Sequence, residues 1–235
     1  MNWKYLGVKY CIEFVVIFLG IFFSFYIEKQ NALGYKEELK DQSLNRLIKN
    51  IEVDINDNII NLEKNSKSIE YFKILLDRGD ELFKNDKDSL GYYLTAMARS
   101  STIFIDNQEE YITLRNSGLI ELIEDDSLVM NLQFKYAIHA YFKKYEKTIR
   151  DSEIAIEEIV NRKTSHIPIG ELIFLEKYSH GKYGTFSFNE PLSDYDLSVI
   201  SNKTNKCYLY VSQIGLALTR DSLLINSIKQ EIEKI

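Results

Sequence analysis

An apolar run near the amino end, Tyr10 to Ile27, constrains the fold of this 235-residue chain more than any other feature. Only Glu13 and Ser24 place conspicuously polar side chains in it. As an α-helix the run extends about 27 Å, close to the hydrocarbon thickness of a bilayer. The bulky stretch "SFYIEKQN" follows, where a cleaved signal peptide needs small residues. The sequence therefore predicts a short tail, 1–9, and an uncleaved single transmembrane helix, 10–27.

One face of this predicted helix differs from the others. At about 100° per residue, a narrow sector of it contains Glu13, Ile17, Gly20, Ser24 and Ile27, whereas Phe and Val cover the opposite surface. Gly20 and Ser24 form a small-xxx-small step that allows two helix backbones to approach closely. A carboxyl group within a span is costly and usually faces protein or water. Because there is one such run, the stripe predicts contact with another copy or another protein.

Two interpretations of Glu13 are open. In the first, Glu13 lies one turn inside the interface, reaches toward the lipid headgroups and pairs with Lys9 four residues earlier. In the second, the stripes of several copies form a ring, with Glu13 at a pore mouth or a helix contact. The two interpretations predict different effects of neutralising this carboxyl group.

The charges beside the run bear on topology. Two lysines precede it, and an excess of Lys and Arg follows it at Lys29, Lys36, Lys40 and Arg46. The positive-inside rule then favours a cytoplasmic domain in the inner membrane, although the short basic tail argues for the opposite orientation. Two distant cysteines provide no disulfide framework, which favours a reducing compartment. The net charge of −6 argues against nucleic acid as the main partner.

The rest of the chain, 28–235, predicts an all-α domain built as a helical bundle. A long heptad-like helix is expected over about 36–78, ending at Gly79, with an apolar seam at Leu44, Ile48, Ile51, Ile55, Ile59, Leu62, Ile69, Phe72 and Leu76. Further helices are expected near 88–104, from a capping box at Asn107 and Glu110 to Gly118, over 126–163 and over 206–234, with a short link at 119–126. A loop-rich insertion, 164–205, with short helices near 170–178, separates the last two.

Two stretches carry a resemblance to a known family. They are "EFVVIFLGIFFSFYIEKQN" at 13–31 and "YITLRNSGLIELIEDDSLVMNLQFKY" at 111–136. They resemble a bacterial single-span membrane family catalogued as a domain of unknown function (number 6090), over roughly the whole chain except 164–205. The chain has "YIEK" at 26–29 where the family more often shows "INNWNE", so contacts at the helix exit differ. The resemblance implies the architecture and no activity.

The sequence contains no catalytic signature. It lacks a phosphate loop, a dinucleotide turn, HExxH and CxxC, and its three histidines lie far apart. We therefore expect no enzymatic activity, no cofactor and no metal. Arg99, Arg115 and Lys135 are the basic residues that we single out for binding an anionic ligand. The alternative for Arg115 is a salt bridge to Glu110 or Glu121.

Two classes of function fit these predictions. One is an oligomeric membrane effector of a bacterial anti-phage defence system, whose helical domain senses a signal and whose spans gather into an ion channel or pore. The other is a non-catalytic, membrane-tethered scaffold or envelope protein that binds a partner through its helical domain. The expected partners are the lipid bilayer, further copies of the chain, and either a partner protein or a small anionic signal.

Overall fold

The computed structural model describes residues 3–164 and 188–234, and this part of the chain is all-α, as the sequence predicts. The predicted short helices near 170–178 lie outside the described residues. The elements are α1 (Trp3–Asn85), α2 (Lys87–Ala98), α3 (Glu109–Asn116), the 3₁₀ helix η1 (Leu119–Leu122), α4 (Asp126–Lys163) and α6 (Asp194–Ile232).

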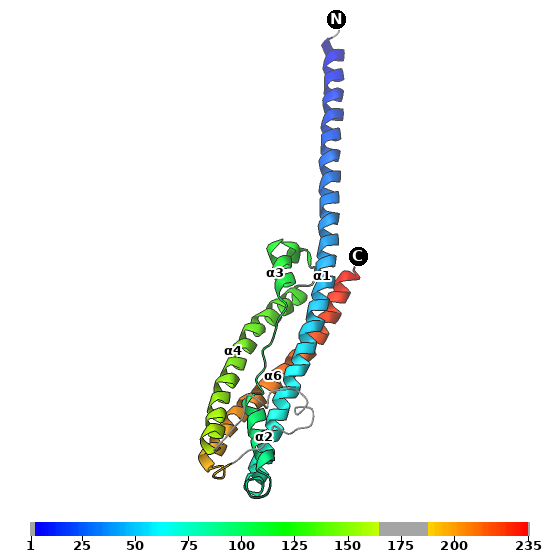
Figure 1. The fold of residues 1–235 in the computed structure, drawn as a ribbon. Helices are drawn as coiled ribbons and strands as arrows, with labels where there is room; N and C mark the ends of the chain where they lie inside the picture. The colour runs from blue at the N-terminus through cyan, green and yellow to red at the C-terminus, as the bar shows by residue number, and fades with distance from the viewer. Residues whose placement is uncertain (1–2, 165–187, 235) are drawn as a thin grey trace.

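Helix α1 is one uninterrupted helix of 83 residues. At 1.5 Å per residue it extends about 125 Å. Figure 1 shows that its first part projects well beyond the bundle. The predictions of a separate helix over 36–78 and of a stop at Gly79 are therefore wrong. Relative to alanine, a glycine inside a helix lowers the stability of that helix by only about 1 kcal/mol. The residues on either side of Gly34 and Gly79 offset this loss.

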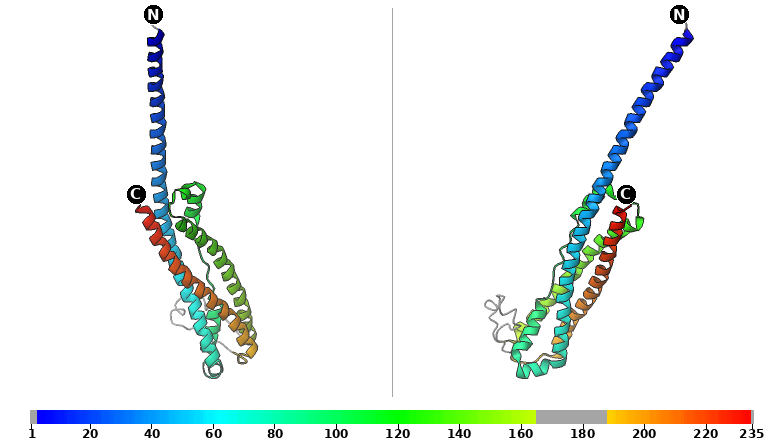
Figure 2. Two further views of the ribbon diagram at one scale, coloured as in Figure 1. Left: turned by 180° about the vertical axis from the view of Figure 1, so that it is seen from behind. Right: turned by 90° about the vertical axis from the view of Figure 1, so that its right-hand side faces the viewer.

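The lower part of α1 packs against α6 and α2, and α4 packs against the same two helices (Figures 1 and 2). Apolar clusters lie at both ends of this bundle. Leu47, Leu132 and Ile228 belong to the cluster nearest the projecting segment, whereas Leu75 and Ile156 belong to the cluster at the far end. A third cluster between them is rich in aromatic side chains. Apolar packing therefore holds the bundle at both ends and between them.

Several helix ends differ from the sequence-based predictions. Helix α2 ends at Ala98 rather than near residue 104. The Asn107 capping box is wrong, because Gln108 precedes α3 and makes no side-chain cap, while the Asn107 amide donates to Asp54. Helix α6 begins at Asp194, within the predicted insertion 164–205, because Ser193 provides a capping box there. Gly118 follows the end of α3 with a φ of 74°, a left-handed conformation that suits glycine.

An extended segment, 99–108, runs along the bundle between α2 and α3. Its backbone amides donate to carboxylates of α1 and α4 rather than to a neighbouring strand. These bonds are Ser101 N to Glu153 (2.6 Å), Phe104 N to Glu146 (2.9 Å), Ile105 N to Asp57 (3.2 Å) and Asn107 N to Asp54 (3.2 Å). Buried backbone groups need partners, so these acids fix the path of the segment.

Candidate functional site

The projecting segment of α1 carries the predicted stripe on its surface. Ile17, Gly20 and Ser24 line one shallow hollow on the helix, together with Ile21, Phe25 and Glu28. The Ser24 hydroxyl donates to the Gly20 carbonyl oxygen at 2.9 Å, which satisfies its polar hydrogen within the helix. A side chain added at Gly20 would meet nothing within 4 Å in the single chain. The stripe is thus flat, open and without steric constraint from its own chain.

Glu13 lies on the same projecting segment before this hollow begins, and Ile27 lies within its length without lining it. The Glu13 carboxylate forms an ion pair with the Lys9 ammonium at 3.8 Å, and both side chains are exposed. This is the i,i+4 pairing that the first interpretation of Glu13 expects. Among the described residues, no helix is both long and apolar enough to cross a membrane.

The three basic residues singled out from the sequence are not brought together. Arg99 lies 3.9 Å from Glu157 at the far end of the bundle, and both are substantially exposed. Arg115 lies over the Tyr111 ring at 5.9 Å, near the projecting segment. Glu110, one of the two partners suggested for Arg115, instead accepts from Ser43 and Arg46. Of the three, only Lys135 occupies an enclosed site.

Lys135 is the centre of a buried ion cluster. Its ammonium lies 3.1 Å from Asp54 of α1 and 2.9 Å from Asp221 of α6. All three residues are buried. Lys135 is on α4, so this cluster joins three helices at one point. Asp54 also accepts from the Asn107 backbone and side-chain amides, which fixes its orientation.

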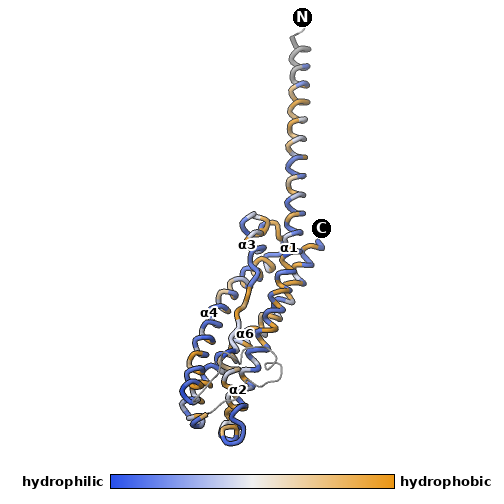
Figure 3. Tube along the Cα trace, viewed as in Figure 1, coloured by the Kyte–Doolittle hydropathy of each residue, from blue (hydrophilic) through white to orange (hydrophobic). Residues whose placement is uncertain are grey.

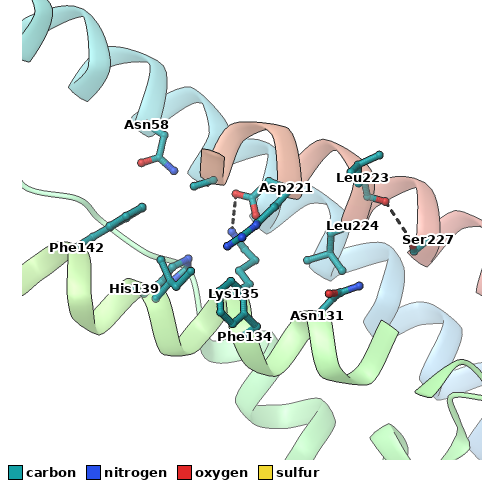
Figure 4. Close-up of a pocket in the computed structure, with 13 residues that line it drawn as sticks. Asn58, Asn131, Phe134, Lys135, His139, Phe142, Asp221, Leu223, Leu224 and Ser227 are labelled. Carbon is teal, nitrogen blue, oxygen red and sulfur yellow. Dashed lines mark hydrogen bonds and ion pairs between the residues drawn. The ribbon is translucent and has the colours of Figure 1, made fainter. Parts of the chain in front are cut away.

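A cavity of about 350 Å³ opens beside this cluster, between α4 and α6. Its polar lining is Asn58, Asn131, Lys135, His139, Arg220 and Asp221. Its apolar lining is Phe134, Ile138, Phe142, Ala217, Leu223 and Leu224. Figure 4 shows Lys135 reaching from α4 to Asp221, with Asn58 of α1 on one side. An apolar cavity with a few converging polar groups is typical of a small-molecule site.

The titratable groups around the cavity are shifted by burial. Burial, helped by the positive charge of Lys135, lowers the pKa of His139 to about 4, against the opposing effect of Asp54 and Asp106. His139 is therefore neutral at pH 7, with its Nδ1 3.2 Å from Asp106. Burial also raises the pKa of Asp221, although Lys135 counteracts the shift. The histidine therefore adds no charge to the site, and burial works against ionisation of Asp221.

The face of α1 that meets this site is polar, which the apolar pattern of the sequence did not reveal. Of the predicted seam, Leu44, Ile48, Ile51 and Ile69 are buried, whereas Ile59 and Leu76 are exposed. Between Ile51 and Ile69 the buried positions are Asp54, Asn58, Asn61, Asn65 and Ser68. These five residues repeat at intervals of four, three, four and three, which is the heptad spacing of a buried face. We call them the polar seam. The signal in the sequence is the repetition of Asp, Asn and Ser at heptad spacing, which a pattern of apolar residues does not detect.

Several atoms of the polar seam have no hydrogen-bond partner. They are Asn58 Oδ1, Asn65 Oδ1 and Ser68 Oγ. Buried polar atoms are rarely left unpaired in folded proteins, since each costs about 1–3 kcal/mol. Asn58 is distinguished from the other two because it also lines the cavity. Its Oδ1 atom is itself enclosed, and Figure 4 shows the amide nitrogen of Asn58 on the side of the other cavity residues.

The chemistry of this site has to be inferred from its own residues. Within the described residues, no three His, Cys, Asp or Glu side chains gather so as to hold a metal ion. No protein-family model, curated protein or solved structure matches the chain. The arrangement offers buried hydrogen-bond acceptors, one shared ammonium and an apolar wall, which suit binding.

Proposed function

We propose that this protein is an oligomeric, single-pass membrane protein, anchored in a bacterial inner membrane through residues 10–27, with its helical domain in the cytoplasm. One observation carries the proposal. Of the sixteen residues 12–27, thirteen are large hydrophobic residues exposed on a free-standing helix (Figure 3), and the other three are Glu13, Gly20 and Ser24. A helix that is apolar on all sides requires cover from protein or lipid.

The length of the run also favours insertion. The run begins at Tyr10, and the side chains of Tyr10 and Cys11 lie outside the described residues, so the described part of it is shorter than the whole. Over 10–27 the helix extends about 27 Å, which matches a bilayer. Membership of the family with domain number 6090 is part of the same proposal, since that resemblance implies a single span at this position.

Assembly is proposed to occur along the stripe of Glu13, Ile17, Gly20, Ser24 and Ile27. Within a bilayer, helices associate where small residues allow close packing, and Gly20 and Ser24 provide such a surface. Because the Ser24 hydroxyl is already bonded to its own helix, it presents little polar surface that lipid would have to solvate. The buried face of α1 in the bundle is already covered by α6 and α2, so the contact between copies is assigned to the projecting segment.

Light scattering of the full-length protein in a mild detergent tests this proposal. The wild type should contain more than one chain per particle, and Gly20→Leu should reduce that number because it blocks close approach. Gly34→Leu is a matched control, since Gly34 also lies in exposed helix with nothing within 4 Å of an added side chain. A monomeric wild type at micromolar concentrations, or equal effects of the two substitutions, would overturn it.

Within this architecture we favour a non-enzymatic effector of an anti-phage defence system, in which the helical domain senses a signal and the assembled spans conduct ions. Asn58, which lines the cavity, and Asp54, which belongs to the ion cluster, lie on the same continuous helix as the stripe, which supports coupling between them. Expression of the wild type under its activating condition should depolarise cells. Glu13→Gln should change conductance or ion preference if this carboxyl group lines the path.

A membrane-tethered scaffold or envelope protein is the second candidate. The Lys9–Glu13 ion pair favours it, because a carboxylate neutralised by a neighbour at the interface lines no pore. In this case Glu13→Gln should leave ion flux, toxicity and oligomer size unchanged. The Glu13→Gln substitution therefore distinguishes the two candidate functions.

A further inference from the structure

The outer face of α6 carries three exposed leucines at equal spacing. Leu209, Leu216 and Leu223 are 58%, 51% and 62% exposed. They lie seven residues apart, which is close to two turns of helix, so they form one row along α6. We call this row the leucine stripe. Apolar residues that repeat every seven positions on an exposed helix face are those that a partner helix covers in a coiled coil.

The surface around the leucine stripe is almost free of charge. Ten residues are exposed between Tyr208 and Asn226, and Arg220 is the only charged residue among these ten. In α4, a stretch of the same length, 140–158, also exposes ten residues, and seven of those are charged. The seven are Lys143, Lys144, Lys147, Arg150, Asp151, Glu157 and Glu158. Depletion of charge on an exposed surface is typical of the centre of a protein interface.

Small side chains flank the leucine stripe on one side. Ser212, Gly215 and Thr219 lie on the turns beside Leu216. A side chain added at Gly215 would meet nothing within 4 Å in the single chain, so packing within the bundle does not require this glycine. Small residues beside spaced leucines leave hollows into which the leucines of a facing helix insert. The stripe is therefore shaped for a helix with the same seven-residue spacing.

The α6 helix of a second copy meets this requirement. It carries the same leucines at the same spacing, and a two-fold axis brings one surface against its own duplicate. Charge favours the same partner. The net charge of −6 makes two copies repel each other, but no acid is exposed between Tyr208 and Asn226. Two copies that meet through this face therefore bring no carboxylates together.

We propose that two copies of the chain pack against each other through the leucine stripes of their α6 helices. The central leucine, Leu216, then faces Leu216 of the second copy across the two-fold axis. Copies anchored side by side in one membrane have parallel α6 helices, so Leu209 also faces Leu209; this orientation rests on the proposed function. The contact itself goes beyond the proposed function, since it requires neither membrane insertion nor the stripe on the projecting segment.

Cysteine cross-linking of the purified full-length protein in a mild detergent tests the contact. Leu216→Cys is made in a Cys11→Ser background, and the buried Cys207 is retained. Oxidation with copper phenanthroline should give a covalent dimer. Ile154→Cys is the matched control, because Ile154 is 56% exposed but lies on the charged face of α4. Leu216→Cys should cross-link at least about tenfold faster, since thiols held in one contact react at a high effective concentration.

Leu209→Cys reports the orientation of the two helices. In a parallel pair it should form a dimer by itself. In an antiparallel pair centred on Leu216, the two copies of Leu209 lie about 21 Å apart, which is too far for a disulfide. Leu209→Cys would then cross-link only to Leu223→Cys. That result would support the contact between α6 helices and contradict the proposed anchoring of the copies in one membrane.

Two outcomes would overturn the proposal. The first is that Leu216→Cys cross-links no faster than Ile154→Cys. The second is that Leu223→Glu, which places like charges at the contact, slows the cross-linking of Leu216→Cys no more than Ile154→Glu does. Both glutamates replace exposed residues, and circular dichroism checks that the helices are retained.

Gly20→Leu separates this contact from the proposed assembly of the spans. It should leave the cross-linking of Leu216→Cys unchanged. If Gly20→Leu also leaves the oligomer size unchanged, assembly along the projecting segment fails and the α6 contact stands. Loss of the cross-link in Gly20→Leu would overturn the α6 contact as an independent one.

Discussion

Lys203 Nζ and Glu153 Oε1 lie 2.8 Å apart in the interior of the bundle, where they join α6 to α4. Lys203 is fully buried and also donates to the Ser100 hydroxyl at 2.6 Å and to the Met97 carbonyl oxygen. Glu153 in turn accepts from the Ser101 amide. The pair therefore also fixes the end of α2 and the start of the extended segment. Such additional hydrogen bonds are what a buried ion pair needs to offset its desolvation.

Replacing Lys203 by methionine should lower the free energy of unfolding by about 3–5 kcal/mol, because it leaves the Glu153 carboxylate buried without its cation. Urea unfolding of the full-length protein, followed by circular dichroism, measures this change. Lys206→Met is the matched control one turn along α6, where the ammonium is only part-buried and bonds to Ser152. Adding Glu153→Gln to Lys203→Met should recover part of the loss. Equal losses for the two lysine substitutions would contradict the prediction.

Acidification should destabilise the fold through His139. An unfolded histidine titrates near pH 6.5, whereas the pKa of His139 in the folded chain is about 4. Between these values the unfolded chain binds a proton that the folded chain does not. The free energy of unfolding therefore falls as the pH drops through this window, by about 3 kcal/mol in all.

Substitution of His139 by glutamine isolates this contribution, because glutamine retains a donor for Asp106 without titrating. Its free energy of unfolding should depend less on pH between 6.5 and 4 than that of the wild type. Burial raises the pKa values of Asp221 and Glu146, so these two groups stabilise the folded chain more as the pH falls. Their contribution is the same in the wild type and in the His139→Gln variant. Superimposable pH profiles would show that the pKa of His139 is not lowered.

The polar seam predicts a stabilising substitution. Asn65 is fully buried, donates to the Asn61 carbonyl oxygen and leaves its own Oδ1 without a partner. Asn65→Leu keeps a similar volume and removes that orphan atom, so the free energy of unfolding should rise by about 1–2 kcal/mol. Leu47→Asn, the reverse change on the same face, should be strongly destabilising. Thermal melts of both variants check the pair, and a loss of stability in Asn65→Leu would count against the prediction.

The proposed topology is tested by protease protection. Added to intact spheroplasts, a protease should leave the helical domain uncut, because the excess of Lys and Arg after residue 27 favours a cytoplasmic location. Lysis of the spheroplasts should expose it to digestion. Digestion without lysis would reverse the orientation and favour the envelope candidate.

Local sequence signals predicted some of this structure closely. Helix α4 begins and ends at the predicted residues, because Asp125 caps its start and a long amphipathic stretch follows without interruption. The glycines at 34 and 79 misled the prediction, since a glycine ends a helix only where the chain turns into a left-handed conformation, as at Gly118. Local sequence signals therefore predict that a helix forms more reliably than they predict where it ends.

The cavity could not have been predicted in the same way. Lys135 was singled out from its charge alone, whereas its partners Asp54 and Asp221 lie on helices more than 80 residues away on each side. Which polar residues of α1 become buried depends on how α6 packs against α1 and how α4 packs against α6. Only tertiary structure brings those three helices to one point.

The continuity of α1 has a consequence for how the two parts of the chain are oriented. Residues 28–39 form a helical stalk of about 18 Å with no joint between the apolar segment and the bundle. One residue inserted after Gly34 would rotate the bundle by about 100° about the stalk, whereas seven would return it to within about 20°. The oligomer size and any ion flux should therefore depend on the rotation that an insertion introduces about the helix axis, rather than on the number of residues inserted. Because α1 is continuous, the angle about its axis between the direction that the cavity faces and the direction that the stripe faces is fixed.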